Sequence, residues 1–133
     1  MAADPREVQT RGARGREAEG AAAEWLEGQG YRVLARNHRG AGGEVDLVCA
    51  DGETLCFVEV RSRASEDHGT PAETIDRAKA RRVARAAEDW SQRNGALDRP
   101  TRFDVVAVNL VDGRPSFELI RAAFDADGDS RLW

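Results

Sequence analysis

Residues 44–61 predict a β-hairpin, because two apolar segments, EVDLVCA and TLCFVEV, flank the turn dipeptide Asp51-Gly52. Side chains alternate across a strand, so each segment has an apolar face and a face that ends in charged residues. One face of the hairpin therefore carries the charged residues Glu44, Asp46, Glu59 and Arg61. Any fold of this chain must accommodate that cluster beside a strand pair whose other face is apolar.

The length of the turn decides which of these charges face each other. A two-residue Asp51-Gly52 loop places Glu44 opposite Glu59, with Asp46 on the diagonal, whereas a four-residue loop places Asp46 opposite Glu59 and Glu44 opposite Arg61. A three-residue loop with a bulge would break the cluster. Like charges opposite each other cost about 0.2–1 kcal/mol. Either Arg61 acts as the counter-ion of an exposed strand end, or the carboxylates bind a divalent cation; the hairpin alone leaves both interpretations open.

The residues before the hairpin predict a helix and a strand. Apolar residues recur at helical spacing over residues 18–26, and Gly28 and Gly30 end the pattern. Residues 31–35 then alternate like a strand. Residues 1–14 carry arginines without periodicity, so we expect a flexible basic N-terminal arm there.

A second helix and two more strands are predicted after the hairpin. Residues 70–73, Thr-Pro-Ala-Glu, have the pattern of a capping box with proline at the first helical position, and Asn94-Gly95 marks the end. FDVVAVNLV and SFELI follow as strands around a turn at Asp112-Gly113. The chain therefore predicts an α/β domain over residues 15–124, with an α-β-β-β-α-β core and a central mixed sheet flanked by helices. Residues 125–133 are expected to form a flexible C-terminal tail.

The composition excludes several classes of protein. The chain has 133 residues, of which 33% are charged, as is typical of one globular domain. It contains no apolar run near the roughly 18 residues of a membrane span, no signal-like segment and no CxxC pair. We therefore expect a cytoplasmic protein with reduced thiols and no membrane partner. The net charge of −4 argues against a surface coated in positive charge.

Two helical residues extend the predicted charge cluster. Glu19 lies at the edge of the apolar stripe of the first helix, either as an ordinary exposed acid or as an acid that reaches over the sheet. Lys79 is the only lysine in the chain and lies near the centre of the apolar row of the second helix. Its ammonium either extends into solvent or is directed at the carboxylates.

The second helix also carries a basic row. Residues 77–85 contain five cations and no acid, namely Arg77, Lys79, Arg81, Arg82 and Arg85. A solvated face is the ordinary interpretation. Beside an acid cluster we favour a face that contacts phosphates, assisted by Arg63 and the N-terminal arginines. Such contacts bind nucleic acid on one face, with strong salt dependence and without reading its sequence.

Five motifs in order resemble a known family. They are Gly15-x-x-x-Glu19 before WLEGQGY, GEVDLV, FVEVRSR, Lys79 with Arg82, and RFDVVAV. Together they are similar to the YraN-type family of uncharacterised bacterial proteins, which is related to archaeal Holliday-junction resolvases in the PD-(D/E)XK nuclease superfamily. The resemblance spans about Gly15 to Phe124 and implies a restriction-endonuclease-like fold.

The resemblance also implies an activity and the residues that perform it. Asp46 and Glu59 would be the metal-binding acids, the Val60 carbonyl a further ligand, Glu19 an assisting acid and Glu44 accessory. The bound Mg²⁺ or Mn²⁺ would organise a water for attack on a phosphodiester. The implied function is that of a metal-dependent endonuclease acting on DNA, branched DNA included. Analogy with the resolvases implies a homodimer.

The sequence departs from the superfamily pattern at Arg61, where a lysine is expected. Arginine stabilises negative charge but does not lose a proton near neutral pH. Lys79 is then the candidate to replace the missing lysine. Two further hypotheses stay open beside the nuclease: a non-catalytic nucleic-acid-binding module that retains the nuclease fold, and a protein-interaction domain with a vestigial site.

Overall fold

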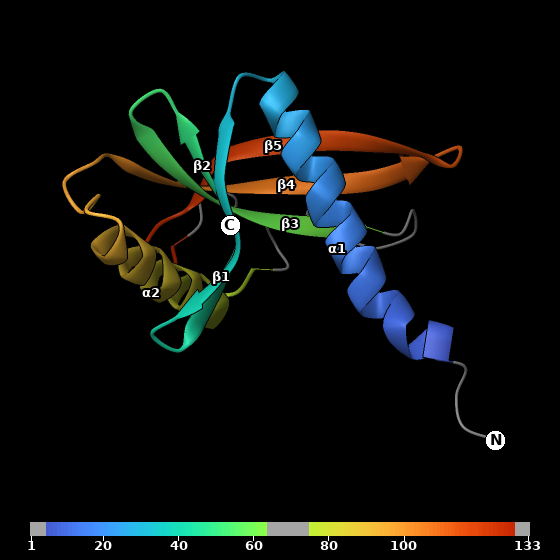
Figure 1. The fold of residues 1–133 in the computed structure, drawn as a ribbon, viewed down its shortest axis with the longest axis horizontal. Coiled ribbons are helices and arrows are strands. Elements are labelled where there is room, and N and C mark those ends of the chain that lie inside the picture. The colour runs from blue at the N-terminus through green and yellow to red at the C-terminus, as the bar shows by residue number, and fades with distance from the viewer. Residues whose placement is uncertain (1–4, 64–74, 130–133) are drawn as a thin grey trace.

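The computed structural model describes residues 5–63 and 75–129 (Figure 1). The elements, in chain order, are α1 (Pro5–Gly28), β1 (Arg32–Gly40), β2 (Gly43–Asp51), β3 (Thr54–Arg63), α2 (Arg77–Arg93), β4 (Thr101–Val111) and β5 (Arg114–Phe124). This order confirms the predicted succession of helices and strands. No helix within the described residues is long and apolar enough to cross a membrane.

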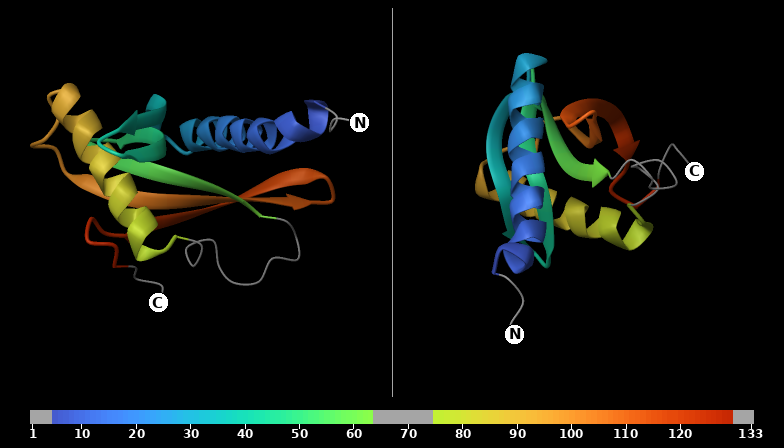
Figure 2. Two further views of the ribbon diagram at one scale, coloured as in Figure 1. Left: turned by 90° about the horizontal axis from the view of Figure 1, so that it is seen from below. Right: turned by 90° about the vertical axis from the view of Figure 1, so that its right-hand side faces the viewer.

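The five strands form a single mixed sheet in the order β1-β2-β3-β4-β5. Neighbouring strands are antiparallel except β3 and β4, which are parallel. A parallel pair needs a long crossover connection, and α2 lies in that connection. Figure 2 shows α1 and α2 on opposite faces of the sheet, which is the α/β layering predicted from the sequence.

Each face of the sheet has its own hydrophobic cluster. Under α2, three phenylalanines of β3, β4 and β5 pack with Trp90, and neighbouring ring centroids lie 5.3–6.1 Å apart. Under α1, Ala22 and Leu26 pack against the opposite face of the sheet. The only acidic side chains buried in the described part of the sheet are Glu59 and Asp104, both 0% exposed. Each of these carboxylates must therefore find its partners inside the protein.

Both helices begin at positions that differ from the expected ones. α1 begins at Pro5, so residues 5–14, expected as a flexible arm, continue the helix. The sequence of residues 5–14 has no apolar periodicity, so the pattern did not predict this part of the helix. The capping box expected at residues 70–73 lies outside the described residues. α2 instead begins after Asp76, whose side chain accepts a hydrogen bond from the Lys79 backbone N at 2.7 Å. Its predicted end at Asn94-Gly95 is confirmed.

Residues 125–129 pack against α2, although the sequence suggested a flexible tail. Asp125 Oδ1 accepts hydrogen bonds from the backbone N atoms of Asp127 and Asp129, so the segment folds on itself. Gly128 lies so close to Arg77 that a Cβ would collide with it. The Asp129 carboxylate and the Asp127 carbonyl oxygen then find arginine partners on α2, which hydropathy alone does not predict. The rest of the expected tail lies outside the described residues.

Candidate functional site

The turn between β2 and β3 fixes the register that the sequence left open. Asp51 pairs with Thr54 and Ala50 with Leu55, around a turn that includes Gly52 with φ of 61°. This is the register expected for a four-residue loop, reached with a tighter turn. The alternative based on an Asp51-Gly52 loop is therefore wrong.

Asp46 and Glu59 meet where β2 and β3 part. Regular pairing runs as far as Leu47 and Val58, and the two acids are the next residues along. The Asp46 backbone N donates to Glu59 Oε2 at 3.0 Å, and the Val60 backbone N donates to Asp46 Oδ2 at 2.9 Å. Each carboxylate thus accepts a hydrogen bond from the backbone of the opposite strand. Beyond Leu47 and Val58, these two bonds connect the strands in place of regular backbone pairing.

The alternation of β2 breaks at the same place. Val45 and Val48 both pack in the cluster that faces α2, although residues three apart on a regular strand point to opposite faces. Glu44, beyond the break, pairs with Arg39 of β1, whose Nε lies 3.5 Å from Glu44 Oε2. The expected pairing of Glu44 with Arg61 is therefore not formed.

Glu59 is a buried carboxylate whose partners are incomplete. Its side chain is 1% exposed, and Oε1 has no hydrogen-bond partner. Lys79 Nζ and Arg61 Nη2 lie 3.4 and 3.6 Å from Oε1, beyond good hydrogen-bond length. Burial and the charge of Asp46 raise the pKa of Glu59 to about 8, against the opposing effect of the two cations. Burial and the charge of Asp46 thus disfavour the ionised form of Glu59 more than the two cations favour it.

The two cations reach Glu59 from different elements. Lys79 extends from α2, so its ammonium is directed at the carboxylates, one of the two orientations expected. Arg61 comes from β3 itself, and its Nε is buried without a hydrogen-bond partner. One oxygen and one nitrogen of this ion pair therefore lack hydrogen-bond partners within the protein.

Glu19 approaches the same acids from α1. Its side chain is half-buried, and its pKa is raised by burial and by the charges of Asp46 and Glu44, while a hydrogen bond from Asn37 lowers it. The described residues contain no group of three or more His, Cys, Asp or Glu side chains arranged to hold a metal ion by themselves. Two carboxylates with a backbone carbonyl are nevertheless enough for Mg²⁺, which keeps several waters and takes phosphate oxygens from a substrate.

The comparisons with known proteins match this chain, over residues 18–108, to the uncharacterised protein family UPF0102. The chain belongs to the UPF0102 family. A UPF0102 protein of Anaeromyxobacter sp. (strain Fw109-5) is 53% identical over 127 residues, which are 96% of each chain. One of Anaeromyxobacter dehalogenans (strain 2CP-C) is 55% identical over 123 residues, 92% of each chain. One of Symbiobacterium thermophilum is 48% identical over 113 residues, 84% of this chain and 96% of the relative.

These findings confirm the YraN-type family membership that the motifs suggested. The matched region includes Glu19, Asp46, Glu59 and Lys79. The UPF0102 family is uncharacterised, so the function of this chain has to be argued from its site.

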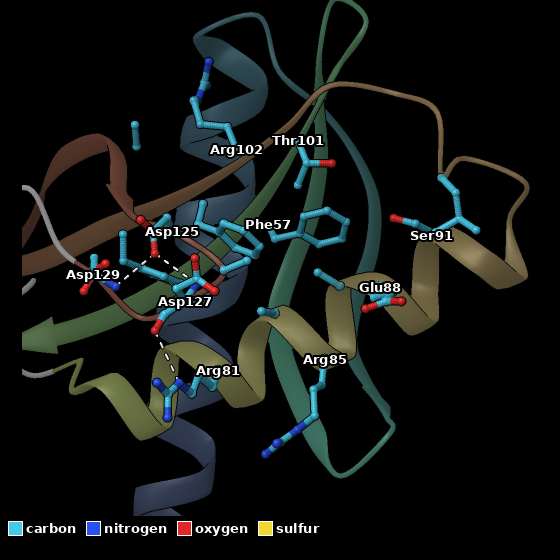
Figure 3. A pocket seen from close by; sticks show the side chains of 17 residues that line it. Phe57, Arg81, Arg85, Glu88, Ser91, Thr101, Arg102, Asp125, Asp127 and Asp129 are labelled. Atoms are coloured by element: carbon cyan, nitrogen blue, oxygen red, sulfur yellow. Dashed lines mark hydrogen bonds between the residues drawn. The ribbon is translucent and has the colours of Figure 1, made fainter.

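The predicted basic row of this UPF0102 protein is divided between two sides of α2. Arg77 Nη2 lies 3.0 Å from Asp129 Oδ1, and Arg81 Nε donates to the Asp127 carbonyl at 3.3 Å. Figure 3 shows Arg81 beside Arg85 at a cavity of about 860 Å³, with the aspartates of residues 125–129 across from Arg81. This side faces the C-terminal segment and not the acid pair.

Only Lys79 and Arg82 of the basic row line a groove beside the acids, together with Arg39. The side chain of Arg63, also predicted to contact nucleic acid, lies outside the described residues. Arg39 belongs to no periodic pattern of the sequence and was therefore not predicted. Asp104 was also overlooked, although a carboxylate that interrupts the apolar strand FDVVAV was a usable signal of a buried polar network.

Proposed function

We propose that this UPF0102 protein is a metal-dependent nuclease that hydrolyses phosphodiester bonds of DNA, branched DNA included. One observation carries the proposal: Glu59 Oε1 is a buried carboxylate oxygen without a hydrogen-bond partner, beside Asp46 and between two cations. Burying such an oxygen is costly unless a ligand completes it. Hard divalent cations bind carboxylate oxygens, so Mg²⁺ or Mn²⁺ fits this donor set.

The residues of the site divide into ligands and charge-stabilising groups. Asp46 and Glu59 would hold the ion, with the Val60 carbonyl and Glu19 as further ligands and Glu44 as an accessory acid. A bound ion supplies an activated water and stabilises charge on the phosphate oxygens. The hydrogen bonds that Asp46 and Glu59 make to the backbone fix both carboxylates before any ligand arrives.

Lys79 replaces the lysine that the superfamily pattern places at position 61. Its ammonium lies 3.4 Å from Glu59 Oε1, so it is positioned next to the proposed ion and to the phosphate that would bind there. An ammonium can stabilise developing negative charge and can also exchange a proton, whereas the guanidinium of Arg61 can only do the first.

A second function follows from Arg61. If the reaction needs a proton acceptor at that position of β3, the protein binds nucleic acid without cleaving it. In that case the basic groups keep their role and the acid pair binds metal only to support the fold.

A cleavage assay tests these functions. Linear and branched DNA are incubated with the protein in Mg²⁺, Mn²⁺ or EDTA, alongside Asp46→Asn, Glu59→Gln and the control Glu53→Gln, an exposed acid in the turn of the same hairpin. We expect cleavage in metal only, and a loss of at least about 100-fold in the two site variants, since even outer-shell partners of metal ligands contribute 10–100-fold.

The possible results separate the hypotheses. Cleavage that survives both site substitutions would refute the assigned site. Binding without cleavage in any metal supports the non-catalytic module. If the protein binds no DNA at low salt, both functions are wrong and the protein-interaction domain remains.

A further inference from the structure

We propose that the groove between the β1–β2 hairpin and α2 is a subsite for a backbone phosphate of nucleic acid. This inference rests on the proposed function and assigns Arg39, Lys79 and Arg82 to phosphate binding. The groove encloses about 400 Å³ and is lined by Arg39, Gly42, Gly43, Glu44, Lys79 and Arg82. Figure 1 shows the tip of the β1–β2 hairpin beside α2.

The charges that line the groove favour an anion. Three cations face one carboxylate, and that carboxylate, Glu44, pairs with Arg39 at 3.5 Å with both side chains largely in solvent, 40% and 78% exposed. Such an exposed pair contributes about 0–1 kcal/mol. A phosphate offers Arg39 stronger, charge-assisted hydrogen bonds, so Arg39 can exchange its partner at little cost.

Glycines let the hairpin lie directly on the helix. A Cβ at Gly43 would collide with the carbonyl oxygen of Arg82, so any other residue there would push the two elements apart. Gly42 at the tip has φ of 77°, which favours glycine. The close approach brings Arg39 of β1 and Arg82 of α2 to the same groove.

A second contact fixes the hairpin about two helical turns further along α2. His38 Nε2 lies 2.8 Å from Asp89 Oδ2, and Arg93 Nε donates to the same oxygen at 2.9 Å. A Cβ at Gly40 would collide with the Asp89 carboxylate, so the strand passes directly beside this side chain. With anchors at Arg82 and at Asp89, the groove is formed before a ligand arrives, and binding costs little reorganisation.

Lys79 connects the groove to the acid pair. Its ammonium lines the groove and lies 3.4 Å from Glu59 Oε1. A phosphate in the groove would therefore be close to the position where the proposed ion binds its own phosphate. On the other side of α2, by contrast, Arg77 and Arg81 already contact residues 125–129. The groove side is thus the side of α2 on which we expect a nucleic-acid strand to run.

A binding assay compares the two sides of α2. The affinity of a labelled DNA duplex of about 20 base pairs is measured by fluorescence anisotropy in EDTA for the wild type, Arg39→Gln, Arg82→Gln and the control Arg85→Gln. The control makes the same change on the same helix, outside the groove. We expect each groove variant to bind about 3–10-fold more weakly than wild type. The slope of log affinity against log salt concentration should become less steep by about 0.9, because one phosphate contact is lost. The control should bind within about twofold of wild type.

The single lysine allows an independent measurement. An amine-acylating reagent modifies Lys79 and the N-terminal amine only, and mass spectrometry follows each. We expect DNA to slow acylation of Lys79, inorganic phosphate at the same phosphate concentration to slow it less, and Arg82→Gln to remove the protection.

Two results of the binding assay would overturn the subsite: wild-type binding that neither groove variant weakens, or a loss of affinity in Arg85→Gln as large as that in the groove variants. Equal protection of Lys79 by inorganic phosphate and by DNA would overturn it as well. The proposed nuclease function survives these results, because DNA would then bind elsewhere on the protein. Absence of DNA binding by the wild type would overturn the function and the subsite together.

Discussion

Glu59 and Asp104 are buried to the same extent, on neighbouring strands, with different sets of partners. Both carboxylate oxygens of Asp104 have partners: Arg102 Nε contacts the two oxygens at 2.9 and 3.1 Å, Arg102 Nη2 donates to Oδ2 at 3.0 Å, and the Ala122 backbone N donates to Oδ1 at 2.9 Å. Glu59 accepts one hydrogen bond, on Oε2, and leaves Oε1 without one. Burial alone therefore does not distinguish a carboxylate with a full set of partners from one with an unsatisfied oxygen, whereas the number of its hydrogen bonds does.

The two carboxylates also serve opposite faces of the sheet. Asp104 pairs with Val58 in the register of β3 and β4, so the neighbouring Glu59 points the other way, toward α2. Asp104 stabilises an irregular point of the sheet, because Ala122 has φ of 51° and the β4–β5 register shifts there. Its site is closed by Arg102, which also donates to the Tyr31 hydroxyl at 2.6 Å.

The largest change in stability is expected for a substitution of Asp104, both of whose carboxylate oxygens have partners. Asp104→Ala removes the main partner of the mostly buried guanidinium of Arg102 and leaves it only the longer ion pair with Asp51, at 3.4 Å. We therefore expect the free energy of unfolding to fall by about 3 kcal/mol. Urea denaturation measures it, with Asp98→Ala as the control at an exposed acid. A loss below about 1 kcal/mol would show that the pair is not the structural element described above.

Glu59→Gln, measured in EDTA, is expected to raise the free energy of unfolding, whereas Asp104→Ala lowers it. The pKa of Glu59 is raised from 4.5 to about 8, so the unfolded chain loses this proton first, and the wild type loses stability as pH rises from about 4.5 to 8. Glutamine carries no such charge. We expect the variant to be more stable than wild type at pH 8, by about 1–3 kcal/mol, and equal to it near pH 4. Lower stability of the variant at both pH values would contradict the incomplete partnering of Glu59.

A smaller effect tests whether metal completes Glu59. At pH 8, Mg²⁺ or Mn²⁺ at five times its dissociation constant should stabilise the wild type by about 1 kcal/mol, through mass action on the folded state. Thermal unfolding with and without metal measures this. Asp46→Asn and Glu59→Gln should abolish the stabilisation, while Glu53→Gln should keep it. A stabilisation of equal size in all four proteins would place the ion elsewhere.

The smallest change in stability is expected at Asp89, a half-buried carboxylate at the edge of the hairpin contact. Hydrogen bonds from His38 and Arg93 lower the pKa of Asp89 below its usual 3.8. The stabilisation from Asp89 is therefore present above that value and is lost as pH falls through the lower pKa of the folded state. We expect Asp89→Asn to lower the melting temperature slightly at pH 7, and less near pH 2. An equal decrease at both pH values would indicate a packing effect instead.

Local rules predicted most of the fold and part of the site. Strand alternation and turn residues placed Asp46, Glu59 and Arg61 together. Helical spacing placed Lys79 on the apolar face of the second helix, with its direction left open between solvent and the acids. These inferences need only the geometry of one hairpin and one helix.

What the sequence did not show depends on contacts between distant segments. The break of β2 at Asp46 and the diversion of Glu44 to Arg39 arise where three strands meet, and no single strand pattern encodes them. The separation of the basic row depends on where residues 125–129 pack. Partner counts, which distinguish Glu59 from Asp104, likewise exist only in the folded protein.

The position of α2 after the acid hairpin in the chain has a consequence for how the site comes into being. The acid pair joins residues 13 apart in the sequence, whereas the contact of His38 with Asp89 that fixes α2 on the β1–β2 hairpin joins residues 51 apart. Because the entropic cost of closing a loop grows with its length, we expect the acid hairpin to form before the groove. A fragment that ends before Arg77 would carry every proposed ligand of the ion and still lack the cations of α2.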